Sequence, residues 1–202
     1  MREIFRSKPR GFLVALSVCV FLSSLPVHSL MIRLPLRTLV NEAEVILLGE
    51  VRDIRSDWSM DRRLILTTAS IRIKEVWKGR VDFHDVMVQY PGGQVGDISL
   101  RVSDVPEFRL GETAVVFLQT IPDPAHPRNT VRAALSAAPV FSVYGKAQGK
   151  YSIGGDDMAR KAGYTLLRGE PDAEAVLPLR FLKSRVKDFL RRPAHLKIGG
   201  KR

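Results

Sequence analysis

The sequence predicts a mostly β domain that is preceded by a short helix and followed by a basic amphipathic helix. Runs rich in β-branched residues recur between glycine- and proline-bearing turns, which is typical of strands. One run, 64–77, alternates apolar and polar residues, as a strand with one solvent-facing side does. Three more apolar runs follow each other within 86–118, separated by a Pro-Gly-Gly loop and by a loop with Pro106 and Gly111.

The first 29 residues contain the three parts of a secretory signal peptide. Four basic residues within the first ten precede an apolar run over 11–22, and Ser-Ser-Leu-Pro-Val-His-Ser follows it. Val27 and Ser29 fit the positions that a signal peptidase reads, so cleavage is predicted after Ser29. The alternative is an uncleaved anchor, but the apolar run is shorter than the roughly 20 residues that cross a bilayer. We therefore expect an exported protein, periplasmic or secreted, with no transmembrane span after cleavage.

The cysteine count and the charge narrow the class of protein further. Cys19, the only cysteine, lies within the signal, so we expect no disulfides in the mature chain. Removing the signal leaves 28 Lys and Arg against 20 Asp and Glu, a net charge of +8. A basic protein favours anionic partners such as an acidic protein, a polymer or lipid headgroups, whereas export argues against nucleic acid.

Five strands are expected in the first part of the mature chain. They cover 45–51, 64–77, 85–90, 96–103 and 113–118. A short amphipathic helix over 34–43 precedes them. Pro91-Gly92-Gly93 is expected to leave the sheet, because proline lacks the ladder donor. The residues expected in the core are Val45, Leu47, Val51, Ile71, Ile73, Val86, Val88, Val115 and Phe117.

The remainder of the chain is expected to add smaller elements to a β domain that spans 30–155. Two runs, 140–144 and 150–153, flank Gly145 and Gly149 and are expected to pair as a hairpin. Residues 156–178 are weakly patterned and predict an irregular excursion. An apolar stripe then predicts a C-terminal amphipathic helix over 179–192, and the tail 193–202 is expected to fray. The stripe consists of Leu179, Leu182, Val186, Phe189 and Leu190.

No residue pattern names a reaction. Gly145-Lys-Ala-Gln-Gly149-Lys150 resembles a phosphate loop, but its glycines are one residue too close and Tyr151 replaces the required Ser or Thr. The three histidines after Ser29 lack ligand spacing, and Asp156-Asp157 fits a turn better than a calcium loop. No Gly-x-Ser-x-Gly elbow occurs. We therefore expect no catalytic residue, no metal and no cofactor.

Two tryptophans remain as candidate contacts. Trp77 ends a predicted strand and is expected in the core. The polar stretch from Arg52 to Met60 is expected to end in a loop that carries Trp58, either as an exposed binding contact or as a structural residue. Trp58 is therefore the one candidate interaction residue.

Five stretches of the sequence resemble a group of uncharacterised secreted bacterial proteins that have the same order, including the Pro-Gly-Gly and Gly-Glu pairs. They are LVNEAEVILLGEV (39–51), ASIRIKEVWKG (69–79), VQYPGGQVG (88–96), VPEFRLGETAVVFL (105–118) and VYGKAQGKYSI (143–153), within a match over roughly 36–153. The first also resembles the entry to netrin-like domains of the tissue-inhibitor-of-metalloproteinase type, where a helix and a strand open an OB barrel. Those inhibitors begin with a zinc-chelating cysteine, which this mature chain lacks.

The expected element order is that of an OB-like five-stranded Greek-key barrel with an N-terminal short helix, an extra hairpin and a C-terminal amphipathic helix. We expect an exported, non-catalytic binding module for an anionic envelope or extracellular partner, a protein or a polymer. Two alternatives stay open. One is an unrecognised hydrolase with a site assembled across the barrel, and the other is a protease-inhibitor-like module.

Overall fold

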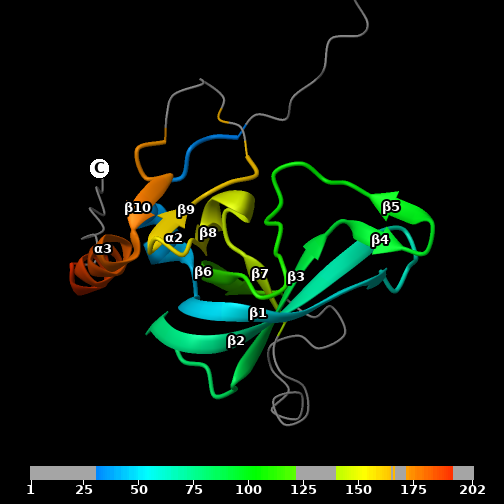
Figure 1. The fold of residues 1–202 in the computed structure, drawn as a ribbon, viewed down its shortest axis with the longest axis horizontal. Coiled ribbons are helices and arrows are strands. Elements are labelled where there is room, and N and C mark those ends of the chain that lie inside the picture. The colour runs from blue at the N-terminus through cyan, green and yellow to red at the C-terminus, as the bar shows by residue number, and fades with distance from the viewer. Residues whose placement is uncertain (1–30, 122–139, 165, 167–171, 193–202) are drawn as a thin grey trace, which may run out of the picture.

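The computed structural model describes residues 31–121, 140–164, 166 and 172–192 (Figure 1). Its helices are α2 (Leu36–Glu42), α3 (Leu179–Arg191) and the short 3-10 helix η2 (Lys146–Gly149). Its strands are β1 (Val45–Trp58), β2 (Ile65–Lys78), β3 (Asp85–Pro91), β4 (Gly93–Val95), β5 (Ile98–Leu100), β6 (Thr113–Thr120), β7 (Val140–Val143), β8 (Lys150–Ile153), β9 (Met158–Arg160) and β10 (Val176–Pro178). The prediction of a mostly β fold with two flanking helices is confirmed.

Eight strands form one sheet in the order β1-β2-β3-β7-β6-β8-β9-β10. The neighbours are antiparallel except for β3 and β7, which are parallel. β1 also pairs with β6, from Val45 opposite Leu118 to Glu50 opposite Thr113. This additional pairing makes the sheet partly closed on itself.

The first strand is longer than predicted, whereas the second has the predicted length. The alternation over 64–77 is confirmed, because alternate residues of β2 from Ile65 to Ile71 are buried. The prediction that Trp58 lies in a loop is wrong, since β1 continues to Trp58, which pairs with Ile65. The outer halves of β1 and β2 form a ribbon of residues 52–72, with β4 packed beside it. The β1 half of this ribbon, 52–58, has no buried residue and therefore tolerates polar side chains, which is why its sequence resembles that of a loop.

The Pro-Gly-Gly stretch leaves the sheet one residue later than expected. Pro91 is still paired, opposite Leu66, as the last residue of β3, and only Gly92 lies between β3 and β4. Gly92 and Gly93 have φ values of 110° and 124°, which a side chain rarely adopts. A Cβ on Gly93 would also collide with the hydroxyls of Ser56 and Thr67, so glycine is required where β4 meets the ribbon.

The predicted hairpin over 140–153 is wrong. β7 pairs with Leu118–Thr120 of β6, and β8 pairs with Thr113–Val116 of the same strand. Both are antiparallel to β6, so they lie end to end along it with η2 between them. The local turn signal was correct, but strand pairing was decided by the register on β6. The extra hairpin of the fold is instead β4–β5, which forms its own two-stranded sheet.

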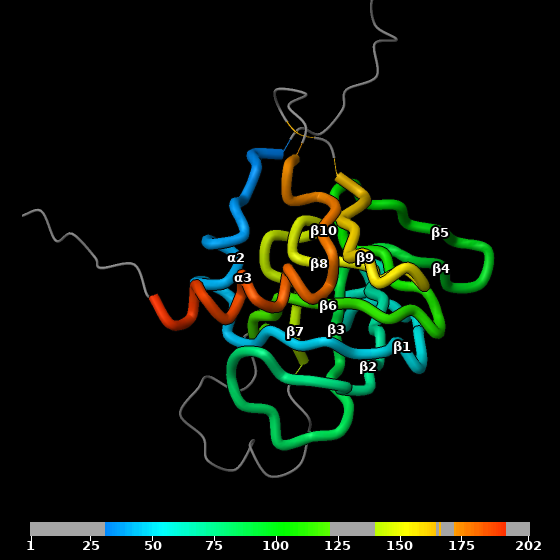
Figure 2. The backbone as a smooth tube through the Cα atoms, turned by 60° about the vertical axis from the view of Figure 1, so that its left-hand side comes forward, coloured from blue at the N-terminus to red at the C-terminus, as the bar shows by residue number. Residues whose placement is uncertain are grey.

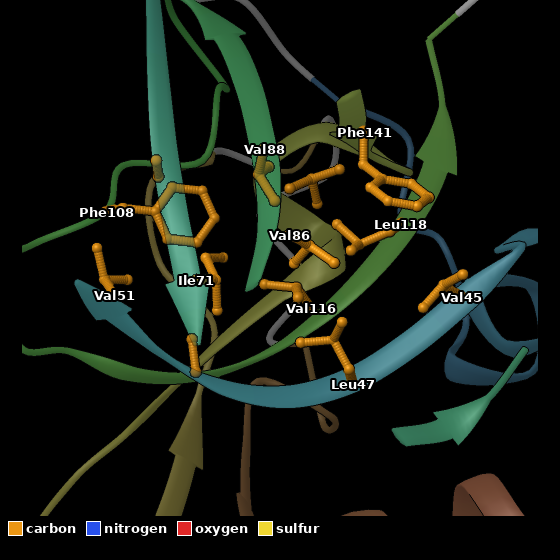
Figure 3. Close-up of a cluster of buried hydrophobic side chains, with 13 residues drawn as sticks. Val45, Leu47, Val51, Ile71, Val86, Val88, Phe108, Val116, Leu118 and Phe141 are labelled. Carbon is orange, nitrogen blue, oxygen red and sulfur yellow. The ribbon is translucent and has the colours of Figure 1, made fainter. Parts of the chain in front are cut away.

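Two clusters of buried apolar side chains lie on opposite faces of the sheet. The inner core fills the space enclosed by β1, β2, β3, β6 and β7, and Figure 3 shows Val116 and Leu118 pointing to the same interior as Val86 and Val88. The outer core packs Val115 and Phe117 of β6 against α2 and α3. All predicted core residues are buried except Ile73, which is half-buried at the edge of the inner core.

Both amphipathic helices are confirmed and lie side by side on the outer core (Figures 1 and 2). Lys78, at the end of β2, donates from Nζ to the carbonyls of Val40, Asn41 and Ala43 at 2.6–2.8 Å, which satisfies the C-terminus of α2. The expected irregular excursion over 156–178 is partly wrong, because it contains β9 and β10. Neither helix in the described ranges is long and apolar enough to cross a membrane.

Candidate interaction surface

Trp58, the residue predicted to make contacts, lies on the ribbon rather than in a loop. It is half-buried, and its backbone N–H donates to Asp57 Oδ1 at 2.7 Å. The turn beyond it exposes Met60 and Leu64. The ribbon and β4–β5 lie at the end of the molecule opposite α3 (Figure 1). The structure therefore does not bring Trp58 to the basic helix.

The net charge of residues 30–202 is confined to the last 24 of them. Residues 30–178 contain 19 Lys and Arg and 19 Asp and Glu, so their net charge is zero. Residues 179–202 contain nine Lys and Arg and one Asp, a net charge of +8. The charged residues of this stretch that the structure describes lie on α3, with Arg192 directly after it.

α3 presents a straight basic row on the side away from the sheet. Leu182 and Val186 are fully buried in the outer core, as the apolar stripe predicted. Arg180, Lys187 and Arg191 are exposed, and we call these three residues the α3 row. Their spacing of seven and four residues places them on one line along the helix, over about 16 Å at 1.5 Å per residue. Ser184, which is small, occupies the same line.

Aromatic rings and arginines alternate along one flank of α3. The guanidinium of Arg185 lies 5.6 Å from the ring centre of Phe181 and 5.2 Å from that of Phe189. Arg37 of α2 lies 5.9 Å from the Phe189 ring. These distances fit cation–π contacts. Phe181 is 45% exposed, so an aromatic side chain is accessible directly beside the α3 row.

A buried polar network holds the segment before α2 against the chain that leads to α3. Asp172, 3% exposed, accepts hydrogen bonds from Arg33 at 3.0 Å and from Tyr164 at 2.8 Å. Lys161, whose side chain is fully buried, lies 3.3 Å from the same carboxylate. Glu174 accepts from the Leu36 N–H at 2.8 Å. These contacts fix the start of α2 relative to β10 and α3.

Burial, hydrogen bonds and neighbouring charges together shift the pKa values in this network. Burial alone would raise the pKa of the Asp172 carboxyl, but the hydrogen bonds from Tyr164 and Glu174 N–H and the charge of Lys161 outweigh it, so the pKa is lowered. Burial lowers the pKa of Lys161, against the effect of Asp172. The pKa of Tyr151 is raised, first by burial and then by the charges of Glu174 and Asp172. Tyr151 is thus kept protonated, which is the opposite of an activated nucleophile.

A second buried ion pair joins β8 to the loop before β6. Lys150 Nζ lies 2.8 Å from Glu112 Oε1, also donates to the Glu107 carbonyl, and stands 4.8 Å from the ring centre of Phe108. Burial lowers the pKa of Lys150, and Glu112 opposes that shift. Sequence reasoning missed both ion pairs. The available signal for the second pair was that Lys150 opens the short strand run Lys-Tyr-Ser-Ile.

One pocket of about 490 Å³ lies at the start of α3. It is lined by Leu48, Glu75, Trp77, Asp156, Asp157, Met158, Pro178, Leu179, Arg180 and Lys183. Lys183 pairs with Glu75 at 2.7 Å, and Arg160 pairs with Asp156, so most of its charge is neutralised internally. Trp77 is buried, as expected, and is one of the lining residues. The Asp156-Asp157 turn is confirmed.

The described residues contain no group of three or more His, Cys, Asp or Glu placed to hold a metal ion. His84 lies in a turn, whereas His126, His195, the predicted signal over 1–29 and the tail 193–202 lie outside the described residues.

No protein-family model matches the chain, and no curated protein matches it.

Proposed function

We propose that this protein is an exported, non-catalytic binding module that holds an anionic partner through the surface of α3. The observation that carries the proposal is the separation of charge, with a neutral body over 30–178 and a net charge of +8 over 179–202. Lys and Arg gathered on one face raise the local concentration of anionic partners and speed their association. The exposed Phe181 ring beside the α3 row adds an aromatic contact of the kind that is enriched at binding sites.

We further propose that the body is an OB-like Greek-key barrel. The support is that β1, β2, β3, β7 and β6 each pair with the next and β6 pairs back to β1, with β3 and β7 parallel. In this interpretation β8–β10 and the β4–β5 hairpin are additions to the barrel. OB folds serve many binding proteins, but the fold alone assigns no ligand.

We propose that Trp58 is a second contact, independent of α3. Its surroundings are close to neutral, because Arg55 pairs with Asp53 and Arg63 pairs with Asp61. We therefore assign the electrostatic part of binding to α3 and treat Trp58 as an independent contact. Trp58→Ala is expected to weaken capture without changing its dependence on salt.

The proposal is tested by capture from an envelope extract with the mature chain, 30–202, between 0.05 and 0.5 M salt. Capture is expected to weaken as salt rises, because the Debye length falls from about 14 to about 4 Å over that range. The α3 variant, Arg180→Glu/Lys187→Glu/Arg191→Glu, is expected to lose at least about tenfold in affinity. Capture that is independent of salt would overturn the proposal.

The matched control reverses three arginines of the ribbon, Arg55→Glu/Arg62→Glu/Arg63→Glu, which changes the net charge by the same amount. All three are exposed. This ribbon variant is expected to bind within about threefold of the parent chain. An equal loss in the two variants would show that total charge, rather than α3, decides binding.

Two further measurements address export and the alternatives. The intact mass of the protein from the envelope fraction is expected to correspond to a chain that begins at Leu30, whereas a mass that includes 1–29 would favour an anchor. Purified protein is expected to leave panels of esters, peptides and glycans unchanged. Turnover that a single polar substitution abolishes would favour the hydrolase alternative.

A further inference from the structure

We propose that the anionic partner is the surface of a lipid bilayer, on which α3 lies lengthwise through the α3 row. This inference rests on the proposed function and specifies its partner. The shape of the basic surface carries the argument, together with the way in which α3 is already packed against the body.

α3 forms a ridge rather than the wall of a groove. It contacts α2, β2, β9 and β10 on its inner side, and no other described element covers its outer side (Figures 1 and 2). Single-stranded nucleic acids, which are flexible polyanions, are held in a positively charged groove that follows their backbone. The pocket at the start of α3 does not supply one, because three acidic residues and only two basic ones line it. A straight convex row of cations fits a flat anionic surface better.

The packing of α3 also sets the depth of contact. Its apolar residues Leu182 and Val186 are fully buried in the outer core, so they are not available for insertion between acyl chains. The α3 row therefore contacts headgroups from outside. Phe181, 45% exposed and beside Arg180 and Arg185, can lie at headgroup level, where aromatic rings next to cations are favoured. Binding is expected to be peripheral and reversible by salt.

Each Lys or Arg at an anionic bilayer contributes about a fivefold gain in partitioning, the equivalent of about 1 kcal/mol. Reversing the α3 row is therefore expected to lower partitioning by at least about 100-fold. Asp188 offers the opposite test, because it is the one acidic residue of 179–202 and is exposed on α3. Asp188→Asn is expected to raise partitioning about fivefold.

The experiment is sedimentation of the mature chain, 30–202, with vesicles of phosphatidylcholine alone or with 30% phosphatidylglycerol. The expected result is binding to the anionic vesicles only, release at 0.5 M salt and at least about a 100-fold loss in the α3 variant. The ribbon variant is expected to bind as the parent does. Phe181→Ala is expected to weaken binding a few fold. If the α3 variant fails to fold by circular dichroism, Arg180→Gln/Lys187→Gln/Arg191→Gln takes its place.

A parallel assay on a sulfated-polysaccharide resin separates this inference from the proposed function. Retention on the resin through the α3 row without binding to anionic vesicles would overturn the bilayer inference and leave the proposed function standing. If the parent chain bound neither the resin nor the anionic vesicles, or if the α3 variant kept both interactions, the bilayer inference and the proposed function would both be overturned. Equal binding to neutral and anionic vesicles would also contradict the bilayer inference.

Discussion

The inner and outer cores share the strand β6 but differ in what they hold together. Val116 and Leu118 face the inner core, whereas Val115 and Phe117 face the outer core. The inner core contains only apolar residues contributed by strands and by Phe108. The outer core includes Tyr151 and is bordered by the Asp172 network, and it holds the two helices. The inner core thus stabilises the partly closed sheet, and the outer core determines where the basic helix lies.

Phe117→Ala is expected to give the largest loss of stability. Phe117 is fully buried between β6 and the helices, so the substitution should lower the free energy of unfolding by about 3–5 kcal/mol, measured by urea denaturation. Leu118→Ala, its fully buried neighbour on the inner face, should cost about 2–5 kcal/mol. Hydrogen exchange should show early opening of α3 only in Phe117→Ala. A loss below about 1 kcal/mol would show that Phe117 is not a core residue.

Asp172→Asn tests the polar border of the outer core. The change leaves Lys161 buried without its carboxylate, which should cost about 3 kcal/mol in the free energy of unfolding. Asp85→Asn, which removes a partly exposed partner of Arg72, is the control and should cost about 1 kcal/mol or less. Equal losses in the free energy of unfolding for the two substitutions would mean that burial of the network does not add to its effect on stability.

The pH dependence of stability sharpens the same comparison. Because the folded pKa of Asp172 is lowered, its carboxylate stabilises the fold above the unfolded pKa of about 3.9 and loses this effect as pH falls through the folded pKa. The difference in Tm between the parent and Asp172→Asn should be constant above about pH 5 and should shrink below about pH 4. A difference that persists to pH 2 would contradict the role assigned to this carboxylate.

The smallest effect on stability is expected at the α3 row. Arg180→Gln/Lys187→Gln/Arg191→Gln should change the free energy of unfolding by less than about 1 kcal/mol, because the three side chains are exposed. Thermal unfolding followed by circular dichroism checks this expectation. A large loss would mean that these residues stabilise the helix, and the losses of binding predicted above would then need a structural explanation.

Pairing partners that are distant in the chain account for what the sequence did not predict. Lys150 and Glu112 are 38 residues apart, and each alone resembles an ordinary surface charge. The location of Trp58 was missed for a different reason: its partner Ile65 is only seven residues further along the chain, but the polar composition before Trp58 is the same in a loop and in a solvent-exposed strand. The candidate surface was easier to predict from the sequence, since the basic residues and the apolar stripe of 179–192 lie in one local stretch.

The sequence by itself determined both flanking helices, most of the long strands and which of their faces are apolar, because side-chain periods of 2 and 3.6 are local properties of the backbone. It also determined that the net charge of residues 30–202 lies in 179–202. Only the tertiary structure decided that β7 and β8 lie end to end on β6, and that Phe117 and Val116 serve different cores. It also decided that the basic helix lies at the opposite end of the molecule from the ribbon that carries Trp58 (Figure 1). These are relations between segments, set by registers and packing that no single stretch of chain contains.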